Sequence, residues 1–192
     1  MILINAEQAD LPRLIQFRRD AAAWLSSEGI DQWSNPFPSA HIARSIEQGE
    51  VFIIRDGAAV AATVTLDRDA DPRIWTSEEA AEPALYVHKL SVDRAYAGRD
   101  LGGAILNWAS SQAAAAGARW LRLDAWTTNP RLQRYYIDHG FEHLRTVTGG
   151  DVVSGWVAQK AALPLPHDLV DQSIGVPPLT PSGMEGEKSQ PL

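Results

Sequence analysis

The turn around residues 93–104 restricts the possible folds more than any other segment. An apolar stretch over 85–92 leads into this turn, and an alanine-rich helix to Ala116 follows it. The turn contains Gly98, Gly102 and Gly103. Backbone N–H groups at such a helix start point at one spot, and the helix dipole adds positive potential. The segment predicts an α/β chain with a place for a phosphate, or a tight strand-to-helix connection that holds no ligand.

Alternating strand and helix signals cover residues 1–160, which we take as one domain. Asp56-Gly57 marks a hairpin between two apolar runs. Strands are predicted over 2–5, 51–55, 58–66, 85–92, 120–127, 141–147 and 152–159. Helices are predicted from Asp10, from Ser39, after Gly103 and from Asn129. This order indicates an α/β fold with an antiparallel front half.

Residues 161–192 differ in composition from the rest. They hold six of the twelve prolines and little periodic apolar pattern. Such a segment is typical of a linker or a disordered end. We therefore expect 161–192 to form a Pro-rich, flexible C-terminal tail.

Composition excludes several classes of function. The net charge is −7 without a basic run, which argues against nucleic acid and against an anionic membrane surface as partners. No cysteine is present, so disulfides and thiolate nucleophiles are excluded. There is no apolar run of about 18 residues and no secretory pattern at the N-terminus, so we expect a cytoplasmic protein. The histidines lack metal-ligand spacing, and no metal is expected.

A second segment, residues 121–141, combines with the glycine turn. Asn129 is placed to cap a helix that begins at Pro130, Tyr136 lies about two turns along it, and Gly140-Phe141 open the next strand. In this order and spacing the two segments resemble the GCN5-related N-acetyltransferase (GNAT) family. The resemblance implies the GNAT fold: a mixed, mostly antiparallel central sheet flanked by helices, with a splayed strand pair at the coenzyme site.

The resemblance also implies a function. It points to an N-acetyltransferase that moves acetyl from acetyl-CoA to an amine of a small molecule by direct transfer. The protein would act as a monomer or a homodimer. Two alternatives stay open: acetylation of protein lysines or N-termini, and a non-catalytic CoA-binding or regulatory module.

Coenzyme-binding residues follow from the same resemblance. They are Leu90, Ser91, Val92, Gly98, Arg99, Asp100, Leu101, Gly102, Gly103, Ala104, Asn129 and Tyr136. Asn129 serves equally well as a plain helix cap. The family has glycine where this chain has Asp100, and arginine or glutamine where it has Ala97. Because a carboxylate repels a pyrophosphate, we expect Asp100 to weaken coenzyme binding unless Arg99 offsets its charge, or unless the Asp100 side chain points to solvent or caps the helix.

Catalytic roles are assigned to three side chains. By resemblance, Tyr136 is the acid that protonates the leaving thiolate, although a core tyrosine is the alternative. His88 is a candidate base, or a core histidine, on a strand face that alternation predicts it shares with Tyr86 and Leu90. Asp124 is the other candidate base.

An aromatic wall is predicted for the acceptor. The assigned substrate residues are Trp24, Gln32, Trp33, Tyr86 and His88. Phe37 and Trp75 extend the aromatic character of this region. Indole faces attract cations, so the wall suits a cationic or planar amine, while core packing would explain the same tryptophans.

Overall fold

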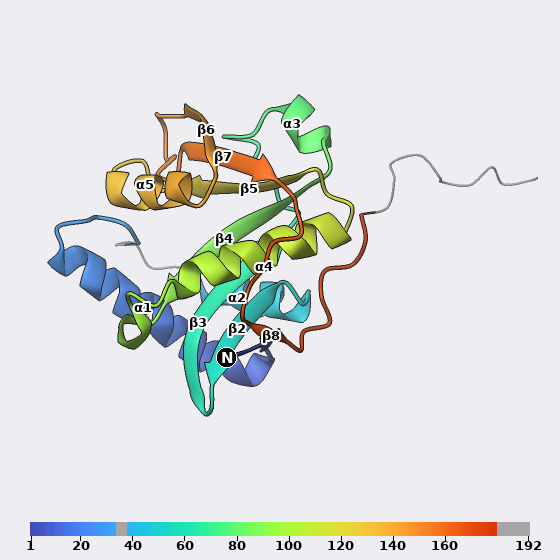
Figure 1. Cartoon of the computed structure of the whole chain (residues 1–192). Coiled ribbons are helices and arrows are strands. Elements are labelled where there is room, and N and C mark those ends of the chain that lie inside the picture. The colour runs from blue at the N-terminus through green and yellow to red at the C-terminus, as the bar shows by residue number, and fades with distance from the viewer. Residues whose placement is uncertain (34–37, 180–192) are drawn as a thin grey trace, which may run out of the picture.

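The computed structural model describes residues 1–33 and 38–179, so Phe37 lies outside the described residues. In these ranges one sheet has the strand order β6-β7-β5-β4-β3-β2-β1-β8 (Figure 1). The strands are β1 (Ile2–Asn5), β2 (Val51–Asp56), β3 (Ala59–Asp67), β4 (Ala84–Val92), β5 (Trp120–Ala125), β6 (Glu142–Thr146), β7 (Trp156–Ala161) and β8 (Val170–Asp171). The pairs β4–β5 and β1–β8 are parallel, and the other pairs are antiparallel. The predicted mixed, mostly antiparallel sheet is confirmed.

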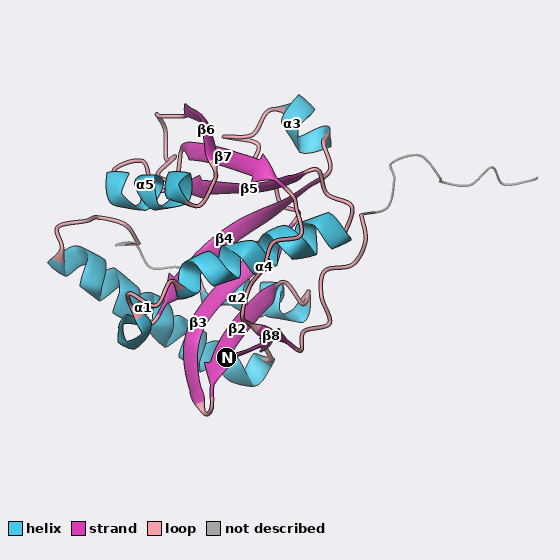
Figure 2. Cartoon of the chain, viewed as in Figure 1, coloured by secondary structure: helices cyan, strands magenta, loops and turns pink. Residues whose placement is uncertain are grey.

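Helices cover both faces of the sheet (Figure 2). They are α1 (Leu11–Ser27), α2 (Ser39–Glu47), α3 (Ser77–Ala81), α4 (Leu101–Ala115) and α5 (Pro130–Asp138), with short 3-10 turns η1 (Gln8–Asp10) and η2 (Arg94–Tyr96). Ile105 and Trp108 of α4 belong to one core cluster, and Phe17 and Ile46 of α1 and α2 belong to another. In the described ranges, no helix combines the length and the apolar character that crossing a membrane requires.

The segment after β7 differs from the predicted flexible tail. Residue 161 still belongs to β7, and the chain then runs along the outer side of α4 (Figure 1). Ser110 and Ser111 bond the backbone of Leu163 and Leu165, and Leu169 is buried in the α4 core. These contacts use isolated side chains and main-chain groups, which leave no periodic pattern in the sequence. Residues 180–192 lie outside the described part.

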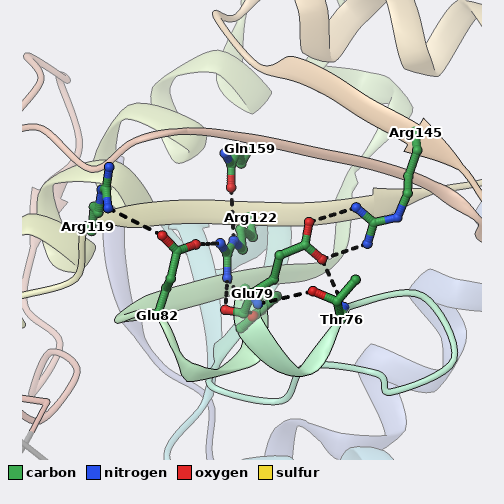
Figure 3. A network of polar contacts seen from close by, with 8 residues as sticks. Thr76, Glu79, Glu82, Arg119, Arg122, Arg145 and Gln159 are labelled. Carbon is green, nitrogen blue, oxygen red and sulfur yellow. Dashed lines mark hydrogen bonds and ion pairs between the residues drawn. The ribbon is translucent and has the colours of Figure 1, made fainter.

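Helix α3 is a second difference, because no helix was predicted between residues 66 and 85. Thr76 and Glu79 form a reciprocal capping box at its start. The fully buried Arg122 of β5 donates to Glu82, to the Glu79 carbonyl and to Gln159 (Figure 3). Arg145 of β6 holds the Glu79 carboxylate at 2.6 and 2.7 Å and lowers its pKa to about 2. This network fixes α3 across β5 and β6.

A substitution at the buried Leu169 can test whether the C-terminal segment belongs to the folded unit. Leu169 is 7% exposed, and Ile174 in the same segment is 87% exposed. We expect Leu169→Ala to lower the free energy of unfolding by about 2 kcal/mol in urea titrations, since it removes buried apolar contacts. Ile174→Ala should change it by less than about 0.5 kcal/mol. Equal, small effects of both would show that the segment contributes no stability.

Candidate functional site

A β-bulge in β4 shapes the site. Thr63 pairs with Ser91 and Thr65 pairs with His88, so Lys89 and Leu90 together oppose one residue of β3. Lys89 has a φ of 53°, in the left-handed region. The extra residue interrupts the alternation of side chains along β4.

The bulge corrects one expectation about side-chain direction. Tyr86 packs in a cluster with Trp75, whereas Leu90 and Val92 pack against the α4 core on the opposite face of the sheet. Simple alternation had placed Leu90 on the face of Tyr86 and His88. That assignment is wrong because the bulge adds one residue between His88 and Leu90.

Just before the bulge, β4 and β5 separate. Their parallel pairing joins Ala84–Val87 to Trp120–Leu123. Asp124 and Ala125 then pair with β7, while the end of β4 pairs with β3. The divergence leaves one side of β4 facing a cleft of about 1050 Å³. This is the splayed strand pair that the resemblance implied.

The cleft collects most of the predicted site residues. Trp24, Gln32, Trp33, His88, Leu90, Ser91, Val92, Asp124, Asn129 and Tyr136 all line it. Tyr86 is buried instead, with its ring 5.4 Å from that of Trp75 and 6.3 Å from that of His88. Its hydroxyl lies 3.3 Å from the guanidinium of Arg122. The buried Tyr86 ring therefore stacks against the His88 ring and does not line the cleft.

The predicted glycine-turn residues lie elsewhere. Arg99, Asp100, Leu101 and Ala104 border a separate cavity of about 420 Å³ beside residues 166–169. A Cβ atom on Gly102 would lie 2.4 Å from the Tyr135 hydroxyl oxygen of α5. Gly102 is therefore needed for the close approach of α5 to α4. Gly98, with a φ of +78°, is needed for the turn.

His88 lies between two carboxylates. Its Nε2 is 3.2 Å from Asp67 and its Nδ1 is 3.6 Å from Asp124. Burial alone would lower the pKa of His88, but the hydrogen bond and charge of Asp67 and the charge of Asp124 outweigh it, so the pKa is raised. Burial raises the pKa of Asp124, against the effect of His88. The sequence analysis missed Asp67, whose contact with His88 depends on strand register.

Two side chains tie the segment after α1 to the start of α5. Asp31 accepts from Trp126 Nε1 at 2.7 Å and from Thr128 Oγ1 at 2.8 Å. Gln32 accepts from Asn129 Nδ2 at 2.8 Å, and Asn129 also caps α5 by accepting from the backbone of Leu132. The predicted helix cap is confirmed. We call these hydrogen bonds, from Asp31 and Gln32 to Trp126, Thr128 and Asn129, the tie across the cleft.

The tryptophans of the cleft carry cations on their faces. The Arg94 guanidinium lies 4.2 Å from the Trp24 ring centre, and that of Arg18 lies 5.0 Å from the Trp33 ring. Lys89, whose pKa is lowered by burial, lines the same cleft. This wall therefore combines indole surface with positive charge, and the carboxylates lie around His88.

Tyr136 sits in an aromatic group at the cleft. Its ring centre is 5.8 Å from Phe141 and 6.5 Å from Trp156. Burial raises the pKa of its hydroxyl, which therefore keeps its proton at neutral pH. The Tyr136 ring thus packs in the core and also borders the cleft.

Among residues 1–33 and 38–179, no group of three acidic or histidine side chains is placed to hold a metal ion.

Comparisons with known proteins identify similar chains. The model of the acetyltransferase (GNAT) family matches residues 18–141. The uncharacterized N-acetyltransferase YesJ of Bacillus subtilis is 30% identical over 135 residues, which are 67% of this chain and 74% of YesJ. A GNAT-family acetyltransferase structure from Listeria monocytogenes has a TM-score of 0.69 at 25% identity, covering 83% of this chain and 94% of that one. The fold of yncA from Salmonella typhimurium, solved with its cofactor acetyl-CoA, matches with a TM-score of 0.60 at 14% identity over 83% and 92%.

The contact between Asp67 and His88 predicts a measurable titration. In Asp67→Asn, the pKa of His88 should fall, because a neutral amide replaces the charged carboxylate that favours the imidazolium. NMR titration of the His88 ring, assigned with His88→Gln, measures the shift. Asp69→Asn makes the same change in net charge at an exposed neighbour and should leave the His88 midpoint nearly unchanged. Equal shifts in both variants would contradict a specific contact.

Proposed function

Since the chain belongs to the acetyltransferase (GNAT) family, which makes it an acyltransferase, we propose that it transfers acetyl from acetyl-CoA to an amine of a small molecule. In this reaction the amine nitrogen bonds to the acetyl carbon, the carbon–sulfur bond breaks, and the thiolate takes a proton. The amine gives up a proton to a base. The chain must therefore supply a binding edge, a base and an acid.

The open side of β4 suits the coenzyme arm. A strand edge presents N–H and C=O groups that need partners, and the divergence of β5 leaves this edge facing the cleft. The backbone of Leu90, Ser91 and Val92 is thus available to bind amide groups and to polarise a carbonyl. The N-terminus of α4 supplies N–H groups and positive potential for a pyrophosphate.

His88 is proposed as the base. The carboxylates of Asp67 and Asp124 beside it attract the ammonium group of a substrate, and they favour a proton on the imidazole ring. Because the pKa of His88 is raised above its ordinary 6.5, the ring becomes neutral, and able to accept a proton, only as pH rises through that raised value. Tyr136 is proposed as the acid, since it lines the cleft and its hydroxyl carries a proton at neutral pH.

The tie across the cleft favours a small acceptor over a polypeptide. Asp31 and Gln32 connect the segment after α1 to Trp126, Thr128 and Asn129, and so bridge the cleft above β4. A long extended chain needs an open groove, which this bridge interrupts. This observation carries the choice of acceptor class.

Thiol release from acetyl-CoA, measured with a panel of small amines and of lysine and N-terminal peptides, tests the proposal. We expect turnover with small amines. As the pH is lowered, kcat/KM should begin to fall while the pH is still above 6.5, because His88 becomes protonated there. His88→Gln should lower kcat/KM by roughly 100-fold or more, and His41→Gln on the exposed side of α2 should not. Turnover with peptides alone would contradict the acceptor class, and full activity of His88→Gln would contradict the base.

Removal of the Tyr136 hydroxyl tests its proposed role as the acid that protonates the leaving thiolate. Tyr136→Phe keeps the ring that packs on Phe141 and Trp156, so the fold should persist. We expect kcat to fall by roughly 10–100-fold with KM little changed, because the loss concerns proton transfer in the transition state. The matched variant Tyr135→Phe, which removes the hydroxyl against Gly102, should retain most of kcat. Equal kcat values in both variants would assign Tyr136 to the core alone.

A further inference from the structure

Asp100 places a carboxylate at the start of α4, where the proposed coenzyme site would bind a diphosphate. It is the N-cap residue of α4, in the left-handed conformation with a φ of 50°, which glycine adopts at least cost. The Asp100 carboxylate folds toward the first turn of the helix. A Cβ atom on Gly103 would lie 2.6 Å from both of its oxygens. An uncompensated negative charge here would oppose the potential that draws an anion to the helix start.

His139 at the end of α5 meets that carboxylate. Its Nε2 lies 3.2 Å from Asp100 Oδ1, and its Nδ1 lies 2.8 Å from the carbonyl oxygen of Tyr135. Both ring nitrogens therefore face acceptors, and only the imidazolium form has a hydrogen on each nitrogen. The two contacts hold the imidazole ring opposite the Asp100 carboxylate.

The histidine is also held in place. Its ring centre lies 4.2 Å from that of Tyr135, and Nε2 would lie 2.5 Å from a Cβ atom on Gly103. Gly103 therefore leaves the space that the Asp100–His139 pair occupies. The side chains of Tyr135 and His139, one turn apart on α5, both rest on the glycine face of α4.

The charge of Asp100 acts on its neighbours. Burial and the charge of Asp100 raise the pKa of Tyr135 to about 12. The other cations near the pair are engaged elsewhere: Arg99 lies over the Tyr96 ring at 5.3 Å, and Arg134 pairs with Asp138 at 2.9 Å. Lys160 lies behind His139, with its Nζ 3.4 Å from the His139 carbonyl oxygen.

We infer that His139 is a positioning residue for the coenzyme: it holds the Asp100 carboxylate against Gly103 and cancels its charge, so that the start of α4 can accept a diphosphate. This inference rests on the proposed use of acetyl-CoA. It accounts for a carboxylate at the position where the pattern implied by the GNAT resemblance has glycine.

A double-mutant cycle tests the inference by calorimetric titration with acetyl-CoA. His139→Gln should raise Kd by roughly fivefold, because the Asp100 charge is then uncompensated. In the Asp100→Asn background, which keeps a side chain tolerant of the left-handed conformation, the same His139 change should alter Kd by less than about twofold. High salt should reduce the effect of His139→Gln in the parent protein by screening the charge. Thermal unfolding verifies that each variant is folded.

The outcomes separate this inference from the proposed function. A loss of affinity that is equal in both backgrounds, or insensitive to salt, would assign His139 a purely structural role and overturn the inference. Unchanged affinity in His139→Gln, with the parent protein binding and turning over acetyl-CoA, would overturn the inference and leave the function standing. A parent protein that does not bind acetyl-CoA would overturn both.

Discussion

One extra residue in β4 creates the conditions for the site. The bulge at Lys89 and Leu90 bends the strand and shifts its side chains relative to β3, and β5 diverges just before it. A left-handed lysine costs about 1–2 kcal/mol of backbone strain, so the surrounding sheet must hold it in place. The result is a strand edge facing a cleft, with His88 directly beside it. The binding edge and the proposed base therefore depend on the same local irregularity.

Neighbouring elements hold this irregular strand rigidly. The buried Arg122 joins α3 to β5 and β7 (Figure 3). Its guanidinium also reaches the hydroxyl of Tyr86, whose ring stacks on that of His88. A buried guanidinium is tolerable because it meets a carboxylate, a carbonyl and an amide oxygen at once. On the other face, the C-terminal segment bonds Ser110 and Ser111 of α4, the helix that starts at the proposed diphosphate site. Contacts outside the cleft thus hold β5 and α4, two elements that border the proposed coenzyme site.

The sequence predicted what depends on local pattern. The glycine turn, the Asn129 cap and the order of elements follow from periodicity and from helix-end chemistry, and the structure confirms them except for α3 and β8, which were not predicted. The capping box of Thr76 and Glu79 was also readable, since a threonine three residues before a glutamate is a helix-start signal, yet the short helix that it starts was not predicted.

Tertiary contacts account for what the sequence could not predict. The pairing of Asp67 with His88 depends on the register of two strands, and the direction of Leu90 depends on the bulge between them. The docking of residues 163–179 uses single serines, one buried leucine and main-chain groups. Asp100 was expected to repel a diphosphate, and its partner His139 lies 39 residues away in sequence. Only the packing of α5 on α4 brings the two together.

Amide hydrogen exchange of the whole chain, with and without acetyl-CoA, tests the central claim most directly. The claim is that the open edge of β4 and the start of α4 form one coenzyme site. The account predicts new protection at Leu90, Ser91 and Val92 and in the first turn of α4, with little change along β1 and β2. Unchanged exchange at these amides under saturating acetyl-CoA, or protection confined to another face, would contradict it.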